Sequence, residues 1–111
     1  MEIFESKTDE GCRILALKGK LDALSSPSFR EKVFSMIEGG ELRILVDCSG
    51  LDYVSSAGLR VFFEAVFKIQ GLSGKLCCYG VNSNVKKIFD LADLTSEMRL
   101  FPSREEAAKH C

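Results

Sequence analysis

Residues 45–60 read LVDCSGLDYVSSAGLR, and this stretch decides the fold. The apolar run at its start is typical of a buried strand, and Ser49-Gly50 favours a turn. From Leu59 onward, apolar side chains recur with the helical repeat. The stretch therefore predicts a strand, a loop and a helix, with Ser55 and Ser56 where the helix begins.

A serine at a helix start has two possible roles. The first turn of a helix leaves backbone N–H groups unpaired and carries partial positive charge, so an anion placed there is stabilised. A phosphoserine suits this position. Serine is also a common helix cap, and either Ser55 or Ser56 could simply accept a hydrogen bond from an early helical N–H. Local sequence leaves both interpretations open.

Strand and helix patterns alternate along the rest of the chain. The expected strands are Ile3–Ser6, Cys12–Leu17, Leu42–Cys48, Lys75–Tyr79 and Glu97–Phe101. The first expected helix begins at Pro27, after a Ser26 cap, and stops at Gly39-Gly40. The second and third are expected over Ser56–Ile69 and Ser83–Ala92. The last begins at a capping box at Ser103 and runs to near Cys111. This order predicts the α/β class: a single domain over residues 1–111, with a mixed sheet of four or five strands and about four helices. Leu42–Cys48, apolar at successive positions, is expected to be the central strand.

Composition limits the classes of protein to consider. A chain of 111 residues with 46% hydrophobic residues can build one ordinary core. Lys and Arg total 15 against 16 Asp and Glu, so a formal net charge of −1 provides no field to attract nucleic acid or acidic lipid. The first residues lack the basic and apolar blocks of a signal peptide, which favours a soluble cytoplasmic protein. Five cysteines, with Cys77 and Cys78 on opposite sheet faces, are expected to stay reduced.

Catalytic and metal-binding patterns are absent from the sequence. The only histidine is His110, so neither Ser56 nor any cysteine has an evident imidazole base. The segment Ser55–Gly58 lacks the first glycine of a nucleophile elbow, and no dinucleotide-binding or P-loop glycine pattern occurs. Cys77-Cys78 is not a C-x-x-C pair. The sequence therefore predicts no enzyme, no cofactor and no metal site.

The stretch around Ser56 resembles the signature of STAS domains, the family of bacterial anti-sigma factor antagonists, in which an acidic or small residue precedes a phosphorylatable serine at a helix start. Matched residue by residue, that serine is Ser56. Gly19-Lys20-Leu21-Asp22 is similar to the family's Gly-x-Leu-Asp element, and Val85–Leu94 looks like its third helix and following turn. Ser55 stands where the best-known members have Asp, and Ala57 where they often have a second Ser or Thr.

The resemblance implies a regulatory protein controlled by phosphorylation. The unphosphorylated chain is expected to bind an anti-sigma factor with serine kinase activity and so to release the sigma factor. Phosphorylation at Ser56, or alternatively Ser55, would prevent this contact, and a protein serine phosphatase would reset it. The expected partner-binding residues are Asp22, Ser55, Ser56, Gly58 and Leu59. The chain would be a substrate and a ligand, a monomer or weak dimer, with no nucleic acid or membrane partner.

Other roles stay open. A STAS domain could be an accessory subunit of a transporter ATPase or a stress-signalling complex, using the Ser56 surface without phosphorylation, and a small-molecule or lipid-binding role comes third. Asp22 either starts a turn before Ser25 or orients Ser56 or a kinase's nucleotide. Phe67, close to the polar face of its helix, lies either at the edge of the core or in a partner contact.

Overall fold

The strands of the sheet lie side by side in the order in which they occur in the chain. The computed structural model describes all 111 residues, and its sheet consists of β1 (Glu2–Lys7), β2 (Arg13–Leu21), β3 (Arg43–Val54), β4 (Lys75–Tyr79) and β5 (Leu100–Phe101). β1 runs antiparallel to β2, and the other neighbouring pairs are parallel. Because β3 is the middle strand, the prediction of a mixed sheet with this segment at its centre is confirmed.

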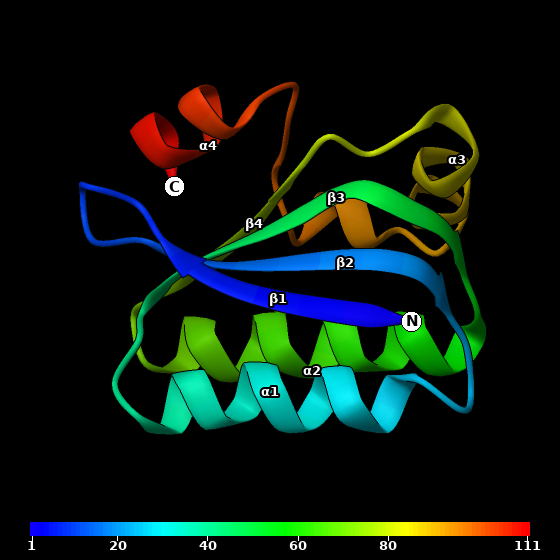
Figure 1. The fold of residues 1–111 in the computed structure, drawn as a ribbon, viewed down its shortest axis with the longest axis horizontal. Helices are drawn as coiled ribbons and strands as arrows, with labels where there is room; N and C mark the ends of the chain where they lie inside the picture. The colour runs from blue at the N-terminus through cyan, green and yellow to red at the C-terminus, as the bar shows by residue number, and fades with distance from the viewer.

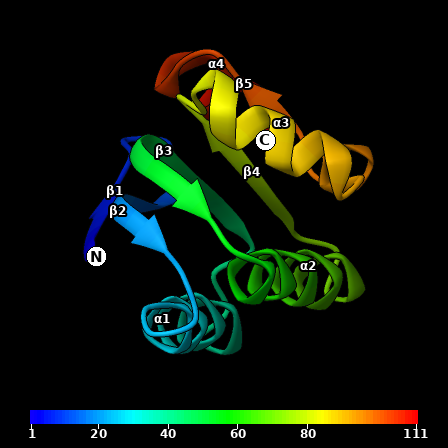
Figure 2. The same cartoon turned by 90° about the vertical axis from the view of Figure 1, so that its right-hand side faces the viewer.

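Helices lie on both sides of the sheet. α1 (Ser26–Glu38) and α2 (Ser56–Gly71) pack next to each other on one side, and α3 (Ser83–Leu91), the short 3₁₀ helix η1 (Leu94–Ser96) and α4 (Arg104–His110) complete the chain (Figures 1 and 2). In the main core, the Phe62 ring contacts the rings of Phe29 and Phe89 at centroid distances of 5.0 and 5.2 Å. Phe62 thereby joins α2 to α1 and α3. The four helices confirm the predicted α/β architecture.

β3 is longer than the sequence predicts, and the turn predicted at Ser49-Gly50 is wrong. The strand continues to Val54 because Leu51 and Val54 supply further buried side chains. Glycine at position 50 lets β3 lie close to β2, since a Cβ on Gly50 would lie 3.2 Å from the Leu17 carbonyl oxygen of β2. β2 likewise runs on to Leu21, whose Cα pairs with that of Val54. The two strands therefore end together.

Other bounds differ from the prediction by a few residues. α1 starts at Ser26 rather than Pro27, and Ser25 occupies the capping position. The predicted last strand shortens to Leu100–Phe101, because η1 and the turn after it occupy the residues before it. Ser103 caps α4 as the capping-box pattern predicts, since its Oγ accepts a hydrogen bond from the Glu106 N–H at 3.2 Å.

The expectation of five reduced cysteines is wrong. Cys77 and Cys78 do face opposite sides of β4, and Cys78 lies in the main core as a free thiol. Cys77, however, faces α4, where it forms a disulfide with Cys111 across a Cα–Cα distance of 6.2 Å. Sequence spacing could not predict this bond because it depends on where α4 docks. Cys12 and Cys48 are also buried and free.

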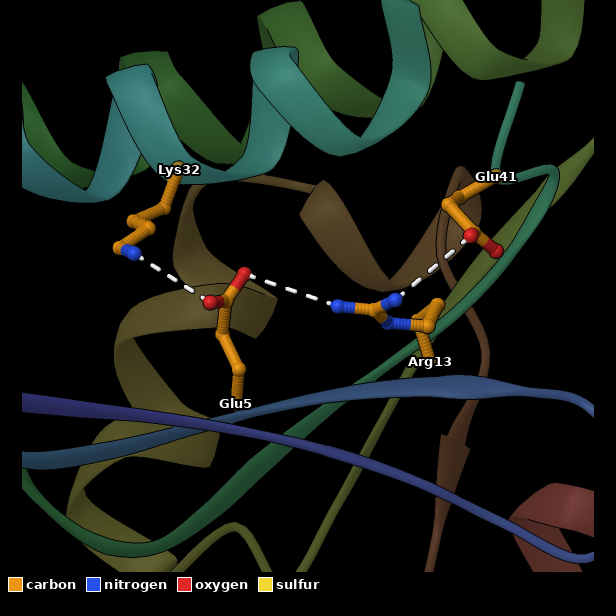
Figure 3. Close-up of polar contacts among 4 residues, drawn as sticks. All are labelled: Glu5, Arg13, Lys32 and Glu41. Carbon is orange, nitrogen blue, oxygen red and sulfur yellow. Dashed lines mark hydrogen bonds and ion pairs between the residues drawn. The ribbon is translucent and has the colours of Figure 1, made fainter. Parts of the chain in front are cut away.

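A chain of ion pairs fastens the edge strand β1 to α1. Glu5 of β1 lies 3.3 Å from the Lys32 Nζ of α1 and 3.8 Å from the Arg13 guanidinium of β2, and Arg13 also lies 3.7 Å from Glu41 (Figure 3). All four side chains are partly exposed, so each pair contributes no more than about 1 kcal/mol. The chain of contacts positions β1 more than it stabilises the fold.

Candidate functional site

Two segments that are distant in sequence meet where β2 and β3 end, on the right-hand side of Figure 1. The Ser55 N–H donates a hydrogen bond to the Leu21 carbonyl oxygen at 2.8 Å, which holds the start of α2 against the end of β2. The loop from β2 to α1 begins at Asp22, directly after this contact. The fold thus brings Asp22, Ser55 and Ser56 to the same edge of the sheet.

Ser55 and Ser56 have different environments. Ser55 is half-buried at the N-cap of α2, with extended backbone, and its Oγ accepts a hydrogen bond from the Gly58 N–H at 3.3 Å. Ser56 is the first residue of the helix and is exposed. Capping is therefore the role of Ser55, while the Ser56 side chain is open to solvent beside the positive end of the helix dipole.

Gly58 allows α2 to approach the end of β2 closely. A Cβ on Gly58 would lie 2.8 Å from Leu21 Cδ2 and 3.0 Å from the Leu21 carbonyl oxygen, so a side chain there requires displacement. Gly58 is buried, and Leu59 is half-buried against the main core. These two residues support the surface from beneath, whereas Ser56 forms part of its exposed face.

Asp22 acts locally, as the turn-forming interpretation predicts. Its Oδ1 accepts hydrogen bonds from the backbone N–H groups of Leu24 and Ser25, at 3.0 and 3.1 Å, and from Ser25 Oγ at 3.2 Å. The Ser25 N–H is the main reason that the pKa of Asp22 lies below its ordinary value of 3.8. No hydrogen bond joins Asp22 to Ser56. Asp22 therefore shapes the loop next to Ser56 without orienting the serine directly.

Three residues near this edge were not found by sequence reasoning. Leu24 follows Asp22 in the loop and is 92% exposed, and Tyr53, near the end of β3, is 46% exposed. Asn82 caps α3 by accepting a hydrogen bond from the Val85 N–H at 2.8 Å, and its Nδ2 donates to the Leu51 carbonyl oxygen at 3.1 Å. A large apolar side chain within a polar turn sequence is the signal that could have drawn attention to Leu24.

A shallow groove of about 370 Å³ runs between the first turns of α1 and α2, next to Ser56. Arg30 of α1 and Glu64 of α2 pair across it at 3.6 Å. The remaining lining residues are Ala23, Ser26, Pro27, Ala57, Arg60 and Val61. Phe67 lies further along α2, is 52% exposed and contacts Phe63 at a ring-centroid distance of 6.0 Å.

The site contains no arrangement typical of catalysis. His110 lies on α4, where its ring stacks on that of Phe101, with the centroids 6.1 Å apart, so it is not a base for Ser56. No three His, Cys, Asp or Glu side chains gather in a way that could bind a metal ion. No helix has the length and apolar content needed to cross a bilayer. What the edge offers is an exposed hydroxyl at the start of a helix.

Comparison with known proteins shows the family of the chain. The family model described as the STAS domain matches residues 4–107. The chain belongs to the STAS domain family. BtrV of Bordetella bronchiseptica is 29% identical over 108 residues, which cover 97% of this chain and 92% of BtrV. The anti-sigma-B factor antagonist of Listeria monocytogenes is 30% identical over 97 residues, covering 86% of this chain and 82% of that protein.

Solved structures of this STAS domain architecture superpose over nearly the whole chain. An anti-sigma factor antagonist from Mycobacterium paratuberculosis matches with a TM-score of 0.87 and 15% identity, covering 97% of this chain and 91% of that one. The Bacillus cell fate determinant SpoIIAA, solved in its phosphorylated form, matches with a TM-score of 0.76 and 18% identity over 97% of both chains. At these identities the structures establish the fold, and the Listeria relative places the chain among the anti-sigma factor antagonists.

Proposed function

We propose that this chain is an anti-sigma factor antagonist whose binding is switched by phosphorylation of Ser56. The unphosphorylated form binds an anti-sigma factor with serine kinase activity, and the sigma factor is thereby released. The observation that carries the proposal is the position of Ser56, exposed at the first residue of α2 on an edge shaped by Asp22 and Ser55. The SpoIIAA structure in its phosphorylated form supports this assignment by fold.

The environments of the two serines favour Ser56 over Ser55 as the phosphorylated residue. The Ser55 Oγ is half-buried and already caps the helix, so a phosphate there would have to displace the hydrogen bond from Gly58. Ser56 can carry a phosphate without losing such a contact. The N-terminal end of α2 tolerates the new negative charge, so the fold need not change.

The switch follows from the charge that a phosphate introduces. A phosphoserine carries about −1.5 to −2 charges at neutral pH, and a partner surface that fits a hydroxyl cannot accommodate that group. Binding is lost until a protein serine phosphatase removes the phosphate. The chain is then a substrate and a ligand without catalytic activity, and its only histidine, His110, lies on α4.

The contact surface consists of the exposed parts of the same edge. Asp22, Ser55 and Ser56 provide polar groups, Leu59 is accessible in part, and Gly58 contributes by letting α2 approach β2. Leu24, which is almost fully exposed, supplies an apolar contact next to Asp22. An exposed leucine beside polar groups suits a protein interface with a small apolar centre and a polar rim. We expect a cytoplasmic monomer or weak dimer that binds the anti-sigma factor through this surface.

A binding titration tests the proposal. An anti-sigma factor with serine kinase activity from the same organism is titrated with the parent protein and with Ser56→Ala, Ser56→Asp and Ser73→Asp. Ser56→Ala should retain affinity, and Ser56→Asp should weaken binding by at least about tenfold, or about 1.4 kcal/mol. Ser73→Asp adds the same charge after the other end of α2 and should leave affinity unchanged. Equal affinity of Ser56→Asp and the parent would favour an accessory subunit that works without phosphorylation.

A further inference from the structure

The last helix buries little apolar surface of its own against the sheet. α4 has only seven residues, and a helix of this length is not stable alone in water. Its buried residues are Ala107 and Ala108, whose methyl groups bury little apolar area. The disulfide between Cys77 and Cys111 is the only covalent link from the end of this helix to the sheet. The attachment of α4 therefore depends strongly on that bond.

Arg43 supplies the main polar contacts at the end of α4. Its Nη2 donates to the Ala108 carbonyl oxygen at 3.1 Å and its Nε to the Cys111 carbonyl oxygen at 3.2 Å. These carbonyl groups lie at the helix end, where a cation is favourable. The same guanidinium donates to the Glu10 carbonyl oxygen at 3.3 Å. Arg43 thus holds Cys111 over β4, and the disulfide to Cys77 completes the attachment.

α4 covers a second, smaller group of buried side chains on its side of the sheet. Besides the residues of the bond and of α4, this group consists of Cys12, Ile14, Leu45, Tyr79 and Phe101. Movement of α4 away from the sheet would expose these side chains to water. A change in the bond would therefore alter the surface of the molecule as well as the helix.

We propose that Cys77 and Cys111 are a reversible redox pair, oxidised by a low-molecular-weight disulfide of the glutathione type, whose state decides whether α4 stays on the sheet. Cys111, the more exposed of the two at 9% against 3%, is the first to react. Its thiolate attacks one sulfur of the oxidant, forming a mixed disulfide and releasing one thiol. The Cys77 thiolate then displaces the second thiol. The protein pair loses two electrons and two protons, and the oxidant is reduced to two thiols.

The proposed pair is separate from the phosphorylation site. Arg43, which positions Cys111, begins β3, whereas Ser55 and Ser56 follow the end of that strand. In Figure 1, α4 lies on the left, and the start of α2 lies on the right. Oxidation of the pair and phosphorylation of Ser56 can accordingly be measured independently.

Glutathione redox buffers test the proposal on the full chain. After equilibration with reduced or oxidised glutathione and denaturation, five thiols should titrate in the reduced protein and three in the oxidised protein, with peptide mapping joining Cys77 to Cys111. Amide hydrogen exchange in α4 should be at least about tenfold faster in the reduced form than in the oxidised form. Cys111→Ser should show the fast exchange in either buffer. Cys48→Ala, which keeps the pair and lies in the main core instead, should show the parent's change in α4 exchange, with one thiol fewer in each form.

Several results would overturn the proposal. Equal exchange of α4 in the two forms would show that the bond does not hold the helix. A bond from Cys77 to a different cysteine, or between two copies of the chain, would show that the pair is wrongly assigned. Failure of oxidised glutathione to form the bond, or of reduced glutathione to open it, would show that the pair is not reversible. None of these outcomes bears on Ser56, and Ser56→Ala should keep the full redox response.

Discussion

At the scale of single residues, neighbouring residues at the start of α2 have different roles. Ser55 caps the helix, Ser56 is exposed, and Gly58 allows contact with Leu21. The sequence predicted serines at a helix start, which the structure confirms, but left open which of the two is the cap; the structure shows that it is Ser55. The packing reason for Gly58 could not be predicted, because Leu21 comes from another strand and only the fold brings it within contact.

Replacing Gly58 by alanine should destabilise the protein by about 1–3 kcal/mol, because the added methyl group would overlap the Leu21 side chain and backbone. The midpoint of urea unfolding measures this change. Gly71→Ala is the matched control, since a Cβ there meets nothing within 4 Å and α2 already includes that residue. Unfolding midpoints that are equal for Gly58→Ala and the parent would contradict the close approach of α2 to β2.

The Asp22 carboxylate should titrate below 3.8 in the folded protein, because the Ser25 N–H stabilises its charged form. Since the pKa is lower in the folded state than in the unfolded state, the contribution of Asp22 to stability is complete above pH 3.8 and is lost as the pH falls through the folded-state pKa. The difference in unfolding free energy between the parent and Asp22→Ala should therefore shrink at low pH. Carboxyl NMR chemical shifts measure the pKa, and a midpoint at or above 3.8 would be inconsistent with these hydrogen bonds.

At the scale of elements, capping and periodicity patterns predicted the ends of a helix correctly where those ends depend on the helix's own residues. The capping box predicted the start of α4, and helical periodicity predicted α2 and α3 almost to their ends. The turn predicted at Ser49-Gly50 was wrong because pairing with β2 overrides local turn chemistry there. The disulfide was missed for a related reason, since Cys77 and Cys111 meet only after α4 has docked.

Removing the α4 cap in Ser103→Ala should destabilise that helix by about 1 kcal/mol, because the Glu106 N–H loses its acceptor. Hydrogen exchange of the α4 amides should accelerate about fivefold, with little change in the unfolding of the whole protein. Ser28→Ala, an exposed serine on α1, provides the comparison. Unchanged α4 exchange in Ser103→Ala would show that the cap does not contribute to holding the helix.

At the scale of the whole molecule, the helices pack on two buried groups of different size. α1, α2 and α3 share the main core, in which Phe62 contacts both Phe29 and Phe89, whereas α4 covers a smaller group on the other side. The sequence predicted the α/β class from the order of the elements and the central strand from its continuous apolar run, and the structure confirms both. The exposed surface near Leu24 was not predicted, since exposure depends on how the whole chain packs.

Reducing the disulfide should lower the free energy of unfolding by about 4 kcal/mol in the chain-entropy model, given that the bond spans 34 residues. Urea unfolding of the oxidised and reduced protein measures the difference, and Cys77→Ser should match the reduced form. Coinciding unfolding curves for the two redox forms of the parent would contradict a bond between these residues that stabilises the native state.

In the function proposed above, Ser56 is the residue through which this STAS domain is switched. The most direct measurement is phosphopeptide mass spectrometry after incubation with ATP and an anti-sigma factor with serine kinase activity from the same organism, using the parent, Ser55→Ala and Ser56→Ala. We expect one phosphate on Ser56 in the parent and in Ser55→Ala, and none in Ser56→Ala. Phosphate on Ser55, or phosphate incorporation that persists in Ser56→Ala, would contradict it.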